Sequence, residues 1–331
     1  MGDLLEITKV MVEPTAKLLE MCGNAIGTIY EPQHMRRMAD AEAYKIRQLG
    51  AAISEMNSLP VEYENGSLSM NTVNLEDFVQ RAQYRANYQM LREQKNVESV
   101  VGKAYQELLD APKVSDESVD EDWTTRFFNI VKEINSEEMQ YIWGKILSGE
   151  VVNPGSFSLR TLDTIRNVSK AEAEIFQKVS SCVLCSNKDG LIPQNLSLLE
   201  KQGVTYDDLI ILSEAGLLNL SSITYTLDFK ATTKFWVNLL SKKYLLRITG
   251  DSDKAFRFSY GVYKLTSAGS ELYTIIDSAP NEEYILAVAS DIGKHFYNKA
   301  DIALHRIISS ENEEISFEEN PFFEQRKTIK T

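Results

Sequence analysis

Apolar side chains recur every three or four residues along most of the first two-thirds of the chain. This is the spacing of an amphipathic α-helix, in which such residues share one face. Residues 3–30 give one such pattern, residues 75–109 give another, and further helices are predicted after residue 123. Runs typical of β-strands occur later, within residues 221–276. The pattern therefore predicts a mainly α fold: a helical bundle followed by a winged-helix-like α+β module.

Breaks in this pattern divide the chain. Pro60 and Asn65-Gly66 lie in a polar stretch, residues 58–71, that predicts a loop. The predicted parts are N-terminal apolar and amphipathic helices (1–57), a long helix with a basic face (72–110), a Trp-containing helical bundle (123–200), the winged-helix-like module (201–278), a C-terminal helix (281–308) and an acidic tail with little reason to fold (309–331).

The first helical pattern ends in the uncharged stretch MCGNAIGTIY. Gly23 and Gly27 lie four residues apart, a spacing that lets a second helix backbone approach closely, and Ile26 and Ile29 flank them. A buried packing helix is the favoured interpretation. The alternatives are a helix that lines an oligomer axis and a helix that inserts into a bilayer.

The second long helix carries a row of basic residues with a tyrosine among them: Arg81, Arg85, Tyr88, Arg92 and Lys95. Their spacing places them near one face, which could bind an anionic ligand such as phosphate or stacked bases. The chain has many acidic residues that could pair with this face instead. A solvated or internally paired face is therefore favoured.

Helix ends in residues 123–200 are marked by residues with capping chemistry. Ser136, Ser158 and Ser169 are predicted N-caps, and Gly149 is a predicted C-cap. Large apolar residues between these ends predict a structural core made of Trp123, Phe127, Trp143, Ile146, Leu162 and Phe176.

In the winged-helix-like module, Gly216 ends a predicted helix and Tyr263–Leu265 resembles the last strand of such domains. The candidate recognition segment, Tyr206 to Leu220, contains acidic residues and no Lys or Arg. Because DNA contacts need positive charge, this module is predicted to contact protein rather than DNA.

Charge and the N-terminal residues limit the location of the protein. The net charge of −13 at pH 7 disfavours a general electrostatic grip on nucleic acid. Asp3 and Glu6 stand where a secretion signal is positively charged. No run approaches the roughly 18 apolar residues of a membrane-spanning helix. A cytoplasmic protein is predicted, with membrane association on activation as an alternative.

The search for chemistry gives weak signals. Cys182 and Cys185 have Cys-x-x-Cys spacing, but zinc normally takes four ligands, and Cys22 and the three histidines are scattered. Two buried thiols on an apolar helix face are the favoured interpretation. The stretch NPGSFS lacks the Lys-Ser/Thr ending of a phosphate loop. No catalytic residue, metal, cofactor or small-molecule substrate is inferred.

The motifs IWGKILSGE, PGSFSLRTLDTIRNVS and AEAEIFQK, which follow the segments RRMADAEAYKIR and YRANYQMLREQKNVESV, resemble a bacterial family of unknown function, DUF2806. The resemblance covers residues 1 to about 220. The sequence is also distantly similar to the abortive-infection alpha proteins of phage defence. The resemblance implies a helical bacterial protein with a role in defence, and it implies no catalytic residue.

These observations predict a non-enzymatic interaction or assembly protein of a phage-defence system, with a protein partner or a second copy as its partner. One alternative is a membrane-acting effector that inserts its N-terminal helix. The other is a nucleic-acid-binding regulator that uses the basic helix face, which the net charge disfavours.

Overall fold

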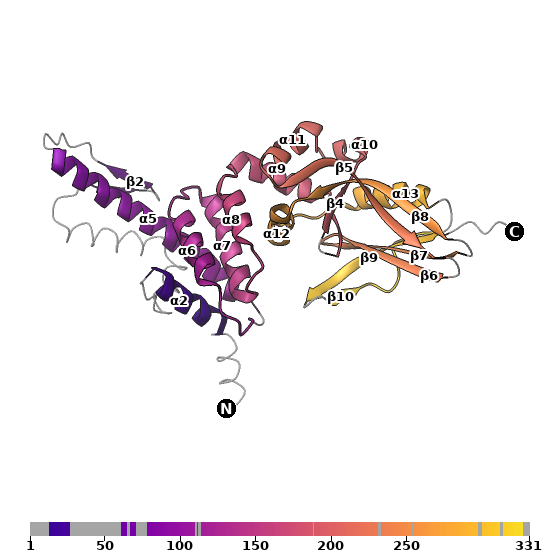
Figure 1. The fold of residues 1–331 in the computed structure, drawn as a ribbon, viewed down its shortest axis with the longest axis horizontal. Helices are drawn as coiled ribbons and strands as arrows, with labels where there is room; N and C mark the ends of the chain where they lie inside the picture. Colours follow the sequence, from indigo (N-terminus) through magenta and orange to yellow (C-terminus); the bar gives the residue numbers. More distant parts are fainter. Residues whose placement is uncertain are drawn as a thin grey trace, which may run out of the picture. The chain divides into compact units, whose positions relative to one another are not determined.

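The computed structural model of the chain describes residues 13–26, 61–64, 67–70, 78–109, 111, 114–187, 189–230, 233–252, 255–296, 300–311 and 314–326 (Figure 1). The chain divides into two units, Met1–Leu162 and Asp163–Thr331. The boundary falls inside helix α8 (Leu159–Arg166).

The first unit is mainly helical where it is described. It contains the helices α2 (Glu13–Ile26), α5 (Phe78–Leu109), α6 (Glu121–Val131) and α7 (Glu137–Val152) and the hairpin strands β1 (Val61–Glu64) and β2 (Ser67–Met70). Helix α5 packs mainly on α7, and α2 packs on α5, α6 and α7. The buried residues of α5 begin at Asn96. Only the second half of this long helix therefore contributes to the core.

Helices α5 and α7 come into close contact at Gly144. A Cβ atom on this residue would lie 2.7 Å from Cβ of Lys103 and 3.2 Å from the backbone N of Ala104. Only a residue without a side chain fits at this distance, because packed interiors leave little room for extra atoms. The glycine of the IWGKILSGE motif thus sets the spacing of these two helices.

A buried carboxylate holds the loop between α7 and α8. Glu150, 1% exposed, accepts hydrogen bonds from the backbone N–H groups of Gly155 (2.6 Å) and Phe157 (2.9 Å). The indole N–H of Trp123 donates to the carbonyl of Phe157 at 2.7 Å. Because buried backbone groups need partners, these two side chains fix the path of the loop.

The second unit consists of an antiparallel sheet with helices. The helices are α9 (Lys170–Ser180), α10 (Leu196–Glu200), α11 (Tyr206–Glu214), α12 (Ser267–Ile275) and α13 (Glu282–His295). The strands are β3 (Leu184–Ser186), β4 (Asp189–Pro193), β5 (Leu218–Phe229), β6 (Thr233–Leu240), β7 (Tyr244–Ser252), β8 (Phe256–Leu265), β9 (Ala300–Glu311), β10 (Glu314–Phe317) and β11 (Phe323–Gln325).

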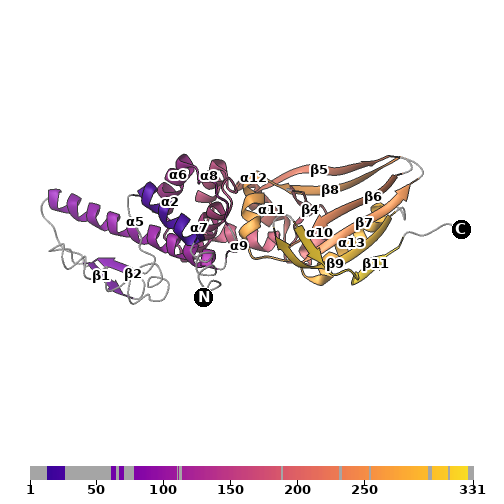
Figure 2. The same cartoon turned by 90° about the horizontal axis from the view of Figure 1, so that it is seen from below.

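Within the described part of the chain these nine strands form one sheet in the order β10-β9-β7-β6-β3-β4-β8-β5, with β11 paired to β9. The pairs are antiparallel. Strand β3 meets β6 at one residue pair, Cys185 with Leu240. Strand β5 lies at the edge of the sheet beside β8 (Figure 2).

The sheet curves around α13. This helix packs on β8 and also on β9 and β11, which stand far from β8 in the strand order. Phe296, directly after α13, stacks on Phe258 of β8, with ring centroids 4.2 Å apart, and faces Phe235 of β6 at 6.3 Å. The core of the second unit therefore lies between α13 and the concave face of the sheet.

The structure contradicts the predicted mainly α fold. A large antiparallel sheet forms the C-terminal region, not a small winged-helix-like module after a helical bundle. Strands β5, β7 and β8 and the helix end at Gly216 lie where the sequence indicates them, but β6 and β9 join them into one sheet. The size of the sheet cannot be predicted from a local pattern, because strand pairing depends on partners that are distant in sequence.

Predicted segments at both ends of the chain also differ from the structure. The predicted loop 58–71 contains the β1–β2 hairpin. The predicted helix 281–308 is α13 followed by β9, in which alternate residues Ala300, Ile302 and Leu304 are buried. The predicted tail 309–331 contains β10 and β11, which both pair with β9. The acidic composition predicts that this segment does not fold, but backbone pairing with β9 orders it as two short strands.

The predicted helix ends agree better with the structure. The side chains of Ser136, Ser158 and Ser169 accept hydrogen bonds from the first turns of α7, α8 and α9. Helix α7 continues past the predicted end at Gly149 to Val152, and the N–H of Asn153 bonds to the carbonyl of Gly149. The predicted Trp-containing bundle 123–200 extends across both units.

Candidate functional site

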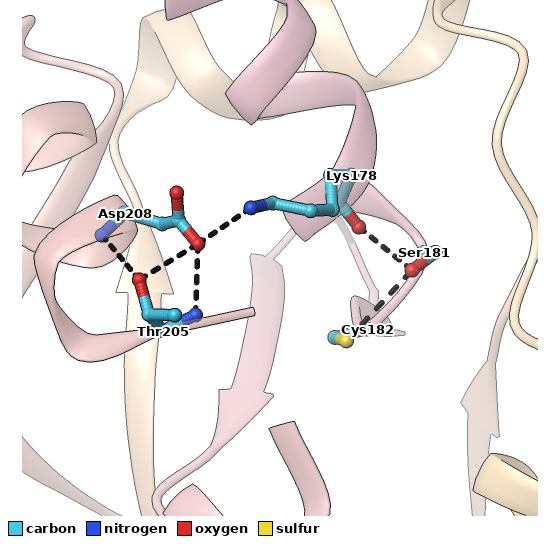
Figure 3. Close-up of polar contacts among 5 residues, drawn as sticks. All are labelled: Lys178, Ser181, Cys182, Thr205 and Asp208. Carbon is cyan, nitrogen blue, oxygen red and sulfur yellow. Dashed lines mark hydrogen bonds and ion pairs between the residues drawn. The ribbon is translucent and has the colours of Figure 1, made fainter. Parts of the chain in front are cut away.

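A cluster of polar side chains in the second unit joins α9 to α11. Both helices begin with a capping box, formed by Ser169 with Glu172 and by Thr205 with Asp208. Lys178, near the end of α9, reaches across to Asp208 (Figure 3). Its Nζ lies 2.6 Å from Oδ2 of Asp208.

One carboxylate oxygen of Asp208 accepts three hydrogen bonds. Its Oδ2 accepts hydrogen bonds from Nζ of Lys178, from the backbone N–H of Thr205 at 2.8 Å and from Oγ1 of Thr205 at 2.9 Å. Burial raises the pKa of the Asp208 carboxyl, but these hydrogen bonds outweigh burial and leave the pKa below its usual range. The carboxylate is therefore ionised at neutral pH and held in place between two helices.

The neighbouring thiol does not extend this cluster into a reactive centre. Ser181 donates to the carbonyl of Lys178 at 2.7 Å, and its Oγ lies 3.8 Å from Sγ of Cys182. Cys182 is connected to Ser181 and not to the Lys178–Asp208 pair in Figure 3. Burial raises the pKa of the Cys182 thiol to about 11. A thiol that stays protonated at neutral pH is a poor nucleophile, so the cluster acts as a clamp between α9 and α11.

The Cys-x-x-Cys pair does not lie on a helix as the sequence suggested. Cys182 is in the turn after α9 and Cys185 is in β3. Burial also raises the pKa of the Cys185 thiol to about 11, although nearby Lys242 acts in the opposite direction. Within the described residues, no group of three or more His, Cys, Asp or Glu side chains is placed to hold a metal ion.

A small apolar cavity lies between the sheet and α13. Its lining includes Leu191, Leu239, Phe258 and Ile292, and its volume is about 10 Å³. This is close to the space that one water molecule needs. Beside it, Tyr260 donates a hydrogen bond to Asp291 of α13 at 2.7 Å. The cavity is too small for a substrate and reflects imperfect packing around α13.

The predicted N-terminal packing residues are only partly described. Gly23 is half-buried in α2, and Ile26 is the last residue of that helix. Gly27 and Ile29 lie outside the described residues. The face of α2 that meets α5, α6 and α7 includes Leu18 and Cys22, both fully buried. None of the described helices combines the length and apolar character that crossing a membrane requires.

The six predicted core residues are all buried. The most exposed of them is Trp123 at 3%, and the others are Phe127, Trp143, Ile146, Leu162 and Phe176. The rings of Trp123 and Phe127 stack at 5.0 Å, and Phe127 meets Trp143 edge-on at 5.6 Å. Phe176 belongs to the second unit and the other five to the first, so the six side chains serve two separate cores.

The predicted basic face of α5 is not uniformly open. Arg81 and Arg85 are exposed, whereas Tyr88, Arg92 and Lys95 are half-buried. The buried Nε of Arg92 has no hydrogen-bond partner among the described residues. The anionic-ligand face therefore stays a prediction, with its first two basic side chains exposed and its other three members half-buried.

Two features of the described residues were missed in the sequence. Asp208 was noted only as a negative charge, because its partner Lys178 lies 30 residues earlier and no local pattern links them. The second feature is an exposed apolar stripe on α5 that includes Val79 and Met90. Their spacing from the buried Val97 and Leu108 is helical and could have revealed the stripe.

A helical unit followed by an antiparallel sheet that curves around a helix defines the class of this protein. The chain belongs to the family described as protein of unknown function (DUF2806), which matches residues 80–289, more than half of the chain. The match runs from the start of α5 into α13, so it includes parts of both units. No curated protein and no solved structure matches the chain.

Proposed function

We propose that the protein acts by binding other proteins, as a non-enzymatic component of an abortive-infection-like phage-defence system in the cytoplasm. The observation that carries the proposal is the first half of α5, which presents apolar side chains to solvent. The phage-defence role rests on the distant similarity of the sequence to the abortive-infection alpha proteins.

The apolar stripe of α5 continues the face that packs on α7. In the second half of the helix this face is buried, at Val97, Val100, Val101, Ala104 and Leu108. In the first half, residues at the same helical spacing are exposed: Val79, Ala82, Ala86 and Met90. Val79 is 63% and Met90 is 53% exposed. One helix thus uses half of its stripe for its own core and leaves the other half for a partner.

Such a stripe fits the recognition mode in which apolar side chains at helical spacing insert into a groove of a partner. Fully burying a side chain such as Val or Met contributes about 1.5–3 kcal/mol. Val79 and Met90 can therefore serve as the anchors of an interface, while the small side chains of Ala82 and Ala86 allow close approach of the partner. Single exposed apolar residues are common on protein surfaces and do not indicate a binding site. A row of them on the same helix face as the buried residues of α5 does indicate one.

Phage challenge of cells that express the protein tests this proposal. Cells with the wild-type chain should reduce plating efficiency for at least one phage of a broad panel, and Met90→Glu should abolish this protection. A charge on the stripe opposes burial. Ile308→Glu is the matched control, because Ile308 is 67% exposed on β9, outside the stripe, and it should leave protection intact.

The melting temperatures of both variants should equal that of the wild type, since both substitutions are at exposed sites. Protection that persists in a folded Met90→Glu variant would contradict binding through α5. Absence of protection against every phage of the panel would contradict the defence role.

A further inference from the structure

The edge strand β5 leaves one side of a long backbone ladder open. Residues Ile223–Phe229 pair in regular antiparallel register with Phe256–Val262 of β8. On its other side, β5 has no neighbouring strand among the described residues. The unpaired N–H and C=O groups of an edge strand are a template for another strand. The irregularity between Asn219 and Ile223 ends the regular ladder, so the open edge comprises the seven residues ITYTLDF.

The opposite edge of the sheet is protected in ways that β5 is not. Strand β10 is four residues long, its pairing with β9 shifts register between Ser316 and Phe317, and acidic residues surround it. Short length, irregular register and charge are the usual means of blocking strand addition. The open edge of β5 has β-branched and aromatic residues, no proline and one charged residue, Asp228, which is paired with Arg257 of β8.

We infer that β5 pairs with β5 of a second copy of this chain, antiparallel and centred on Thr226, so that two sheets become one. The choice of a second copy rests on self-complementarity. In this register Ile223 faces Phe229 and Tyr225 faces Leu227, so the half-buried apolar side chains of both copies meet on one face. A two-fold symmetric contact requires the same patch on both subunits, and this seven-residue run supplies it.

The exposed polar side chains agree with the same register. Thr224, Thr226 and Asp228 lie on the other face, where Thr224 faces Asp228 of the second copy and Thr226 faces its equivalent. No like charges stand opposite one another. Parallel pairing in register would place Asp228 against Asp228, which is unfavourable for like charges directly across a ladder.

This interface is separate from the α5 stripe of the proposed function. Strand β5 belongs to the second unit and α5 to the first. Each surface can therefore be tested without altering the other.

Disulfide cross-linking of the full-length chain tests the register. Residues opposite each other in an antiparallel pair have Cα atoms about 4.5–5.5 Å apart, within the range of a disulfide. Thr226→Cys should therefore form a covalent dimer on oxidation. Thr224→Cys should not, because its equivalent in the second copy is four residues away along the strand, about 14 Å. Both variants carry Cys185→Ser, since Cys22 and Cys182 are buried and Cys185 is not.

Light scattering tests the dimer itself. The wild type should approach twice the chain mass of 37.5 kDa as concentration rises. Thr226→Lys should be monomeric, because two ammonium groups would meet at the centre of the ladder, and an equal mixture of Thr226→Lys and Thr226→Glu should restore the dimer. Thr226 is exposed, so each variant should keep the wild-type circular dichroism spectrum.

A wild type with the mass of one chain at every concentration would overturn the inference. So would a Thr224→Cys dimer without a Thr226→Cys dimer, which would indicate another register. Met90→Glu should leave the Thr226→Cys cross-link unchanged. If Met90→Glu abolishes the cross-link, self-association depends on α5 and the β5 interface is wrong. If Met90→Glu abolishes phage protection but keeps the cross-link, that result bears only on the proposed function and leaves the β5 interface unaffected.

Discussion

Single carboxylate side chains fix the geometry of this protein at two places. Glu150 holds the loop after α7, and Asp208 ties α11 to α9. The chain contains 48 Asp and Glu residues, and composition does not distinguish these two from the rest. The Thr205-to-Asp208 capping spacing is local and visible in the sequence, but Lys178 lies 30 residues away from Asp208. Sequence reasoning could therefore have found the capping box but not the clamp.

Replacing Asp208 by Asn should destabilise the second unit by about 1–2 kcal/mol, because it removes the charge that Lys178 and Thr205 bind. Urea unfolding at pH 7 measures this loss. Lys178→Met is the control that removes the ion pair but keeps the capping box, and it should cost less. Equal stability of wild type and Asp208→Asn would show that the clamp contributes nothing.

The same residue predicts a pH dependence. The pKa of Asp208 is lower in the folded chain than in the unfolded chain, so its contribution is complete above the unfolded pKa of about 3.9. It is lost as pH falls from there through the folded pKa. The stability difference between wild type and Asp208→Asn should therefore shrink below about pH 4. A difference that grows on acidification would have the wrong sign.

At the scale of elements, helix caps could be predicted from neighbouring residues, whereas strands that pair with distant residues could not. The N-caps Ser136, Ser158 and Ser169 could be located because capping chemistry acts within four residues. Strand β9 was predicted as part of a helix, although it pairs with Tyr244–Gly250, 50 or more residues earlier. Its buried His305 interrupts the simple alternation of apolar and polar positions, and the partner strand that decides its conformation is not visible locally.

The contact between α5 and α7 predicts opposite effects for two glycines. Gly144→Ala should destabilise the first unit by about 1–3 kcal/mol, because the new methyl group would overlap Lys103 and the α5 backbone. Gly102→Ala on α5 is the matched control, since no atom lies within 4 Å of its added Cβ. It should stabilise by up to about 1 kcal/mol through helix propensity. Urea unfolding of both variants measures the difference, and a loss of stability at Gly102 as large as that at Gly144 would contradict it.

At the scale of the whole molecule, the helical first unit was foreseen and the sheet of the second was not. Helices depend on residues close in sequence, so Trp123, Phe127 and Trp143 could be assigned to a core from spacing alone. The runs that form β5, β7 and β8 are β-like in the sequence, but Thr233–Leu240, which forms β6, was not predicted as a strand. The α5 stripe and the β5 edge are surface properties that depend on what the rest of the fold leaves uncovered, and no local pattern contains that information.

The division into two units predicts two unfolding transitions. Each unit has its own core, so calorimetry should resolve two heat-absorption peaks or one asymmetric peak. Gly144→Ala should lower the melting temperature of one transition and Asp208→Asn that of the other, by about 2–4 °C per kcal/mol. A single transition shifted equally by both variants would mean that the units unfold together.

The single pair between Cys185 and Leu240 has a mechanical consequence for the second unit. On one side of it stand β3, β4, β8 and β5, and on the other β6, β7, β9, β10 and β11, so the sheet consists of two sets of strands joined at one residue pair. Breaking one backbone hydrogen bond costs about 1 kcal/mol, whereas separating β6 from β7 would break a ladder eight residues long. The stiffness of this unit across its middle therefore depends on side-chain packing around α13, which contacts β8 on one side and β9 and β11 on the other. Phe296, directly after α13, adds to this packing because it stacks on Phe258 of β8 and lies near Phe235 of β6.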